Sequence, residues 1–318
     1  MFKLLVLGAT GFVGSSVCEK LVERSGAADG RVRVATRLRN RARHLQLLPT
    51  VEIEDGDVHD DATLARMLRD TDAVINLVAI LHGSEDEFER THVRLPAVLA
   101  AACQTAGVKR VVHVSAIGAA IDAPSRYLRS KGRGEAALKA APIDLTILRP
   151  SVIFGERDSF LNMFARLHSV LPVLPLASGE ARFQPVWVED VASAIVAAID
   201  DPSTIGTTIE CCGPRVYTLA ELARAAGRWS GVSRPVLGLP AALARLQAFF
   251  MELLPGTPLI SRDNLDSMRV ANVASGKLPG LERLGIAPAP LEAVAPRYLG
   301  HVSGEKRLEA LRSGARRG

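Results

Sequence analysis

The chain has few of the residues that build several common kinds of site. Aromatic residues are 4% of its 318 residues, so stacking on nucleic-acid bases is a poor candidate for its main activity. Its four cysteines show no CxxC spacing and its seven histidines are scattered, which predicts buried thiols and no metal site. No uncharged apolar run reaches about 18 residues, so a membrane-spanning helix is not expected.

Charge of one sign is only slightly in excess. The 39 basic and 34 acidic side chains leave a formal net charge of +5. The excess gathers in residues 37–43 and at the end of the chain without a recognised binding motif, so no nucleic-acid partner is expected. The first residues lead directly into an apolar run and a glycine loop, which predicts a strand rather than a secretion signal. A cytoplasmic location is the resulting expectation.

Short apolar runs alternate with helical patterns through the first half of the chain. This alternation predicts an α/β fold with a doubly wound parallel sheet, the Rossmann fold. After Pro150 proline and glycine become frequent, which predicts a smaller C-terminal α/β lobe. The expected domains are 1–155 for the nucleotide fold, 156–302 for the smaller lobe, interleaved with the sheet edge, and 303–318 for a basic tail. Strands are predicted at 3–7, 32–36, 51–54, 73–78, 111–115 and 145–149, and helices at 12–24, 39–48, 60–69, 86–106, 126–140, 189–200, 218–229, 239–253 and 290–298.

A glycine loop follows the first predicted strand and opens a helix. Gly8 permits the tight turn, Gly11 lets the backbone approach a pyrophosphate, and Gly14 lets the helix pack closely. The N-terminus of the helix supplies N–H donors and the positive end of its dipole. The loop therefore predicts a nicotinamide dinucleotide as cofactor.

The end of the second predicted strand indicates which dinucleotide is bound. An NAD enzyme usually has an acid there to accept from the ribose hydroxyls. This chain has Arg37, 23 residues after Gly14, and a guanidinium suits a 2′-phosphate. Arg39 or Arg41 could add a contact, and the alternative is a solvated basic helix start. The pattern favours NADP(H) over NAD(H).

Several motifs together resemble a known superfamily. They are GATGFVG at 8–14, GDV at 56–58, NLVA at 76–79, VSA at 114–116, Tyr127-x-x-x-Lys131 and LRPSVIFG at 148–155. In this order they resemble extended and atypical short-chain dehydrogenases/reductases over about residues 1–200. The stretches 183–192 and 262–265 are similar to one branch, described as NAD-dependent epimerase/dehydratase-like, which contains the nucleotide-binding accessory subunit of respiratory complex I and its bacterial relatives.

The resemblance implies further cofactor contacts. Asp57 would accept from the adenine amine, although it could instead be a turn residue before the next helix. Val58 would flank the adenine, and Ala79 would line the nucleotide after the fourth strand. Pro150 and Val152 would border the nicotinamide. The remaining implied contacts, within the glycine loop, are Thr10, Phe12 and Val13.

Tyr127 and Lys131 are four residues apart in a helical stretch, so their side chains share one face. In a reductase of this type the tyrosine donates the proton, while the lysine lowers the phenol pKa and can hold the nicotinamide ribose. Extended members usually add a Ser or Thr at a position that is Ile117 here. Ser115 is the candidate substitute, and Ser125 is an alternative. Whether the chain is an enzyme therefore stays open, with the balance toward yes.

The apolar segment 239–254 has two readings. It either covers the core of the smaller lobe or offers a face, around Phe249, Phe250 and Met251, to an apolar substrate, a membrane or a partner.

Three functional hypotheses follow. The first is an NADP(H)-dependent oxidoreductase acting on a carbonyl or alcohol, with a small-molecule substrate, one option being an apolar one. The alternative is a non-catalytic cofactor-binding accessory or assembly protein linked to respiratory complex I. A weaker alternative is a sugar-nucleotide epimerase or dehydratase. A peripheral membrane or respiratory-complex contact is left open.

Overall fold

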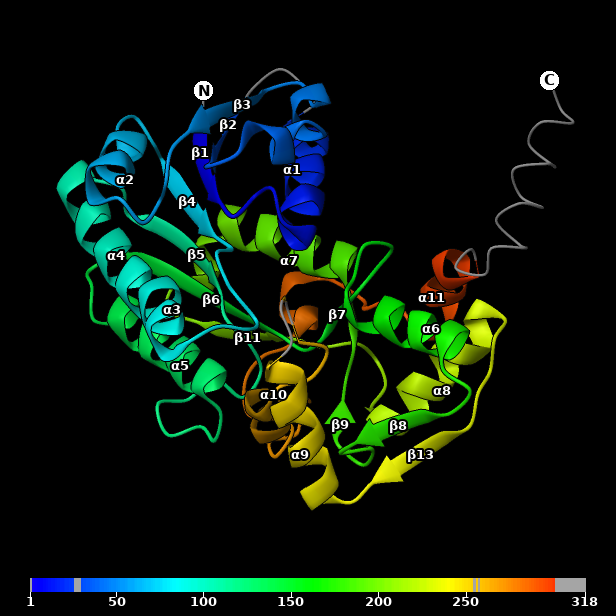
Figure 1. Ribbon diagram of the computed structural model, residues 1–318. Helices are drawn as coiled ribbons and strands as arrows, with labels where there is room; N and C mark the ends of the chain where they lie inside the picture. The colour runs from blue at the N-terminus through cyan, green and yellow to red at the C-terminus, as the bar shows by residue number, and fades with distance from the viewer. Residues whose placement is uncertain (1, 26–29, 254–255, 257, 301–318) are drawn as a thin grey trace, which may run out of the picture. The chain divides into compact units, whose positions relative to one another are not determined.

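A seven-stranded sheet in which all neighbouring strands run parallel forms the centre of the computed structural model, which describes residues 2–25, 30–253, 256 and 258–300 (Figure 1). Its order confirms the predicted doubly wound fold, because the strand order reverses between β1 and β4. Ligands of such sheets bind beyond the carboxyl ends of the strands at this reversal. In sheet order the strands are β11 (Thr208–Cys211), β6 (Asp144–Pro150), β5 (Arg110–Val114), β4 (Ala73–Asn76), β1 (Phe2–Leu7), β2 (Gly30–Thr36) and β3 (Val51–Asp55).

Helices cover both faces of the sheet (Figure 1). Leu5 and Leu7 of β1 belong to a core cluster with residues of α2 (Asp61–Leu68), α4 (Leu95–Ala106) and α5 (Arg126–Lys139). On the other side α1 (Phe12–Ser25) packs against α7 (Val188–Asp200). Because both faces are covered, β1 is apolar without alternation, and each fully buried leucine contributes about 1.5–3 kcal/mol.

Two predicted helices are less regular than expected. The stretch 86–106 consists of α3 (Glu85–Phe88), the π-helical turn η3 (Glu89–Arg94) and then α4. The stretch 39–48 forms only two 3-10 turns, η1 (Arg39–Ala42) and η2 (Leu45–Leu47). In these two turns Ala42 and Leu45 are the buried residues, so too little apolar surface is covered to support a full helix.

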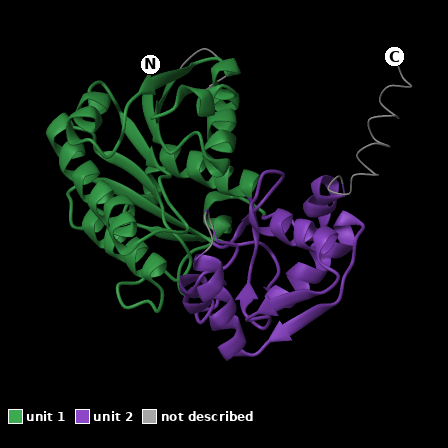
Figure 2. Ribbon diagram, in the orientation of Figure 1, with its two compact units in different colours: residues 1–150, 188–211, 274–287 green, residues 151–187, 212–273, 288–318 purple. Residues whose placement is uncertain are grey.

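The chain divides into two compact units whose segments alternate along the sequence (Figure 2). The first unit comprises residues 1–150, 188–211 and 274–287. The sequence placed the main boundary at 155, with the later lobe interleaved with the sheet edge. In the structure two later segments belong to the first unit, where β11 pairs with β6 and α7 packs against α1. The first unit also contains the 3-10 turns η4 (Pro202–Thr204) and η5 (Leu281–Leu284). The predicted basic tail, 303–318, lies outside the described residues.

The second unit, residues 151–187, 212–273 and 288–318, has its own core. Its apolar centre lies among α6 (Phe160–Val170), α8 (Leu219–Ser230) and α11 (Leu291–Leu299). Within the described ranges no helix is both long enough and apolar enough to cross a bilayer. The remaining elements are β7 (Ile153–Phe154), β8 (Leu174–Ala177), β9 (Arg182–Phe183), β10 (Val186–Trp187), β12 (Tyr217–Thr218), β13 (Val236–Leu239), α9 (Ala241–Glu252) and α10 (Arg262–Ser267).

Candidate functional site

The glycine loop lies at the carboxyl end of β1, where the strand order reverses. Gly8 has φ +83°, a left-handed conformation that favours glycine, and a Cβ there would lie 3.0 Å from the carbonyl carbon of Leu77. A Cβ on Gly14 would lie 2.6 Å from the carbonyl carbon of Ala9, so the helix α1 requires glycine to pack on the loop. Gly11 is exposed, and a Cβ on it would meet only the oxygen of Gly8, at 3.3 Å. The loop thus leaves open backbone beside a helix N-terminus, which suits a pyrophosphate.

The other implied loop contacts surround this open backbone. Thr10, Phe12 and Val13 are half-buried, and Phe12 is the first residue of α1. The first N–H groups of a helix have no acceptor within the helix, so those of this turn suit an anion. The contact roles of these three residues remain predictions.

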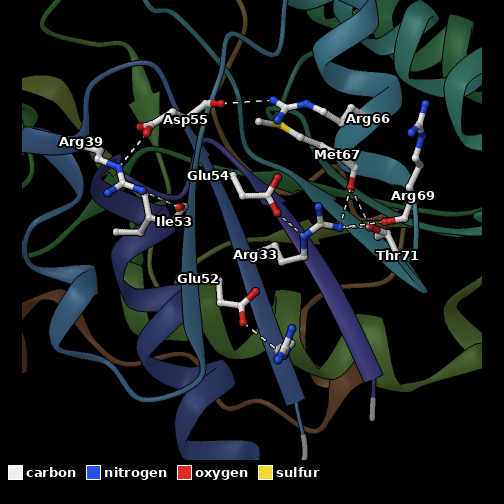
Figure 3. Close-up of polar contacts among 11 residues, drawn as sticks. Arg33, Arg39, Glu52, Ile53, Glu54, Asp55, Arg66, Met67, Arg69 and Thr71 are labelled. Carbon is white, nitrogen blue, oxygen red and sulfur yellow. Dashed lines mark hydrogen bonds and ion pairs between the residues drawn. The ribbon is translucent and has the colours of Figure 1, made fainter.

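Two exposed arginines follow β2, and they differ in whether they form an ion pair. Arg39 pairs with Asp55 of β3, its Nε 2.8 Å from a carboxylate oxygen (Figure 3). Arg37 directly follows β2 and is exposed. No ion pair of Arg37 occurs with any residue that the structure describes. The contact of Arg37 with a 2′-phosphate, to which Arg39 or Arg41 could add, remains a prediction.

A third arginine of β2 has a structural role. Arg33 pairs with Glu54 at 2.5 Å and donates to the carbonyl oxygens of Met67 and Arg69, at the end of α2 (Figure 3). It also donates to the Thr71 hydroxyl at 3.1 Å. The cation thus satisfies carbonyl groups at a helix C-terminus, and its charge is committed within the fold.

Asp57 lies in the turn after β3, as both readings of it require. One carboxylate oxygen accepts the His59 N–H at 3.0 Å and the other lies 3.5 Å from Arg90. Burial lowers the pKa of the neighbouring His59, with contributions from the charges of Arg37 and Arg90, while Asp57 opposes them. The turn reading of Asp57 is thus met, and its contact with adenine stays a prediction, as does that of the half-buried Val58.

The side chain of Lys131 lies buried at the carboxyl end of β5. Its Nζ donates to the carbonyl oxygen of Val114 at 2.8 Å, and the residue is 2% exposed. Burial lowers the pKa of Lys131 to about 8, against the opposing charge of Glu135. Tyr127, one turn earlier on α5, packs edge-on against His92. The sequence expected the lysine to lower the phenol pKa, but burial raises the pKa of Tyr127 to about 12, because desolvation penalises the phenolate.

Ile117 stands where extended members usually have a Ser or Thr, and Ser115 and Ser125 are the two candidates to supply the hydroxyl instead. Ile117 is 3% exposed, and its N–H donates to the carbonyl oxygen of Pro150 at 3.0 Å. The Ser125 hydroxyl accepts from the Leu128 N–H and caps α5, so it is engaged. The Ser115 hydroxyl is buried, and no partner for it occurs among the residues described. A buried unpaired hydroxyl costs about 1–3 kcal/mol. The role of Ser115 as the substitute for the usual hydroxyl remains a prediction.

The remaining nicotinamide-side candidates are placed as follows. Ala79 is exposed and follows β4, and Pro150 is the buried last residue of β6. Val152 is half-buried in the second unit, where its N–H donates to the Asn272 side chain at 2.8 Å. Their contacts to a cofactor remain predictions. Within the described ranges no cluster of His, Cys, Asp and Glu could hold a metal ion.

Sequence reasoning missed two groups at the site. Glu135, 2% exposed, forms a two-bond fork with Arg149 at 2.8 and 2.6 Å and so ties α5 to β6. His92, 1% exposed, contacts Tyr127 and Ser130. An acid one turn beyond Lys131 was a signal for the first group, whereas a single histidine in a long helical pattern gave none for the second.

The apolar segment after β13 is anchored by small residues. On α9 Ala244 and Ala248 are buried, while Leu243, Leu246 and Phe250 are 53%, 51% and 58% exposed. These three exposed residues recur at helical spacing, so one face of α9 is an apolar stripe. Ala244 and Ala248 pack in a core cluster, as the covering reading expects, and the docking of the exposed face on a substrate, a membrane or a partner stays a prediction.

A comparison with family models decides the family. Residues 4–212 match the NAD dependent epimerase/dehydratase family. The chain belongs to this family. The assignment confirms the resemblance drawn from the motifs and, at the level of NAD(P), the expectation of a dinucleotide site. It leaves open the choice between NADP(H) and NAD(H).

The relatives of this family member include subunits and enzymes. The chain is 32% identical over 294 residues to NADH dehydrogenase [ubiquinone] 1 alpha subcomplex subunit 9, mitochondrial, of Mus musculus, covering 90% of this chain and 77% of the relative. It is 30% identical over 237 residues to a ceramide reductase of Caulobacter vibrioides, covering 74% and 73%. A nucleoside-diphosphate-sugar epimerase of Staphylococcus aureus superposes with a TM-score of 0.73 at 17% identity, covering 94% and 100%, and shows the fold alone.

The expectation about partners needs correction. It put a small-molecule substrate first and treated a respiratory-complex contact only as an open option. A relative matched over 90% of the chain is itself a subunit of the mitochondrial NADH dehydrogenase. Contact with such a complex is therefore a more plausible expectation than the order of the predicted partners implied. Because that relative is described as mitochondrial, the cytoplasmic location stays a prediction.

Proposed function

We propose that the chain is an accessory protein of a respiratory NADH dehydrogenase-type complex and that it holds NADP(H) at its glycine loop. The observation that carries this proposal is similarity over 90% of the chain to a subunit of such a complex. The loop geometry supports the nucleotide part, because Gly8 and Gly14 occupy positions where a Cβ would meet backbone.

NADP(H) is preferred for an electrostatic reason. The exposed Arg37 lies at the end of β2, where an acid would bind the ribose hydroxyls of NAD, and Asp55 beside it is paired with Arg39. A guanidinium can bind a 2′-phosphate with two charge-assisted hydrogen bonds. The same residue argues against a sugar-nucleotide epimerase, for which NAD would be expected.

The residues expected beside the nicotinamide fit a nucleotide that is held for a structural role. Ile117 occupies the position where a hydroxyl usually binds the reacting carbonyl, and its side chain is buried. The loss of such a donor commonly costs a few kcal/mol of barrier. Lys131, whose Nζ donates to the carbonyl oxygen of Val114 at the carboxyl end of β5, remains suited to hold a nicotinamide ribose.

Two measurements test the proposal. Titration of the purified chain with NADPH and NADH gives the two dissociation constants, and a tenfold preference for NADPH corresponds to about 1.4 kcal/mol. Native electrophoresis of membranes solubilised with mild detergent then shows whether the tagged chain migrates with NADH dehydrogenase activity. Equal affinity for NADH would remove the argument from Arg37, and migration away from that activity at all detergent levels would remove the accessory role.

A second candidate function is NADP(H)-dependent reduction of a carbonyl group. The specific observation that favours it is the unpartnered Ser115 hydroxyl, together with Tyr127 and Lys131. The bound nicotinamide would supply the hydride to the carbonyl carbon. The Tyr127 hydroxyl would give its proton to the carbonyl oxygen, and Ser115 would donate a hydrogen bond to the same oxygen.

This candidate is tested with NADPH and a panel of ketones and quinones. A reductase predicts turnover that falls at least a hundredfold in Tyr127→Phe, the usual size of a lost proton donor. Turnover unchanged by the substitution would remove Tyr127 as the acid, and absence of turnover in the wild type would leave the accessory role.

A further inference from the structure

His92 lies at the centre of the π-helical turn η3 and is 1% exposed. Its Nε2 accepts the backbone N–H of Ile80 at 3.1 Å, and its Nδ1 lies 2.8 Å from the Ser130 hydroxyl. Acceptance at Nε2 requires a lone pair, so the ring proton is on Nδ1 and donates to Ser130. Both ring nitrogens are therefore engaged, each with a different part of the site.

The Ile80 side of this link leads to the glycine loop. Ile80 belongs to the segment that follows β4, and residues Leu77 and Val78 of the same segment lie against Gly8. A Cβ on Gly8 would be 3.0 Å from the carbonyl carbon of Leu77 and 3.1 Å from the nitrogen of Val78. The segment is thus one wall of the loop, and the bond to His92 fixes its far end.

The Ser130 side leads to Tyr127. The Ser130 hydroxyl donates to the carbonyl oxygen of Tyr127 at 2.8 Å, and the rings of His92 and Tyr127 meet edge-on with centroids 5.6 Å apart. A Cβ on Gly134 would overlap the carbonyl oxygen of His92, so α5 and η3 are in backbone contact. The helix that carries Tyr127 and Lys131 is therefore held directly on His92.

The charge state of His92 keeps this link constant. Burial, aided by the charge of Lys131, lowers the pKa of His92 to about 3. The ring is accordingly neutral near pH 7, and its acceptor and donor do not exchange roles.

We infer that His92 is a positioning residue: it holds the segment after β4 against the helix of Tyr127 and Lys131 and thereby keeps the cofactor site in its binding-competent form. The inference rests on the proposed cofactor binding and adds a residue to which no cofactor contact is assigned. A π-helical turn at this point is consistent with it, because such turns occur frequently at functional sites. If the segment is released, the competent fraction falls and the apparent dissociation constant rises in proportion.

Two near-isosteric variants separate the two sides of the ring. His92→Gln places an amide oxygen at about the reach of Nε2 and keeps an acceptor for Ile80. His92→Asn places an amide nitrogen at about the reach of Nδ1 and keeps a donor for Ser130, but leaves the Ile80 N–H without its acceptor. The dissociation constants for NADPH and NADH are measured by titration calorimetry well below the melting temperature of each variant, which is recorded in parallel.

We expect His92→Asn, which releases the segment beside the glycine loop, to raise the dissociation constant of the preferred cofactor about tenfold. His92→Gln releases only the Ser130 side, where the backbone contact between Gly134 and the His92 carbonyl oxygen still holds α5, so it should change the constant less than about twofold. Equal affinity of both variants and the wild type would overturn the inference, and so would losses that simply follow the melting temperature. If the wild type binds neither NADPH nor NADH, the proposed cofactor function itself fails, and the inference falls with it. That result is distinct from wild-type binding that the variants leave unchanged.

Discussion

Replacing each of two glycines of the loop by alanine should separate folding from cofactor binding. A Cβ on Gly14 would come within 2.6 Å of the carbonyl carbon of Ala9, and this neighbour is backbone that cannot rotate away. Overpacking of this kind costs about 1–3 kcal/mol, here at the upper end, while alanine recovers about 1 kcal/mol over glycine within a helix. The net loss for Gly14→Ala is therefore about 2 kcal/mol.

Gly11→Ala is the matched control. A Cβ on Gly11 would lie 3.3 Å from the oxygen of Gly8 and would otherwise point into open space, so the stability should change by less than about 0.5 kcal/mol. The same Cβ would obstruct the approach of a pyrophosphate to the backbone, so we expect a loss of NADPH affinity of at least tenfold.

Urea unfolding followed by circular dichroism, together with NADPH titration, measures both effects. With an m-value of about 3 kcal/mol/M, the midpoint of Gly14→Ala should fall by about 0.7 M, while that of Gly11→Ala stays within about 0.2 M. Equal destabilisation by the two substitutions, or full NADPH affinity in Gly11→Ala, would refute the assignment of distinct roles to the two glycines.

Three further predictions follow. Arg37→Ser should weaken NADPH binding about tenfold and leave NADH binding unchanged, as titration calorimetry can measure. Arg31→Ser, an exposed arginine at the amino end of the same strand, is the control, and an equal effect of Arg37→Ser on both cofactors would count against a 2′-phosphate contact. Phe250→Glu should reduce the fluorescence of an apolar dye without lowering the melting temperature, because Phe250 is 58% exposed on α9; unchanged dye binding would contradict the apolar stripe. The pKa of Lys131 is lowered from 10.5 to about 8, so between these values the unfolded chain binds more protons than the folded chain and the free energy of unfolding should rise with pH. Chemical denaturation at about pH 8–9.5 should show this rise in the wild type but not in Lys131→Met. Free energies of unfolding that change in parallel with pH in the two proteins would contradict the prediction.

The parts of the fold that could be predicted are those whose signal is local. The six predicted strands have apolar runs, and the glycine loop follows the first of them directly. β11 was missed because its four residues include Glu210, whose burial is possible only through tertiary partners. Its carboxylate accepts the N–H of Ser275 at 2.7 Å, which is 65 residues away. No local pattern could indicate that pairing.

The same division holds within the site. Tyr127 and Lys131 could be predicted because a spacing of four places them on one helix face. The link through His92 could not, since it joins Ile80 and Ser130, which lie 12 and 38 residues from it along the chain. The pKa of Tyr127 also departed from expectation, because its direction depends on burial that only packing determines.

Complementation tests the central claim most directly. In the organism that supplies this chain, the gene is deleted and replaced by the wild type, Tyr127→Phe or Gly11→Ala, and NADH:quinone reductase activity is measured in isolated membranes. An accessory role for a held nucleotide predicts that wild type and Tyr127→Phe restore the activity and that Gly11→Ala does not. Loss of the activity in Tyr127→Phe, or its full recovery in Gly11→Ala, would contradict the account.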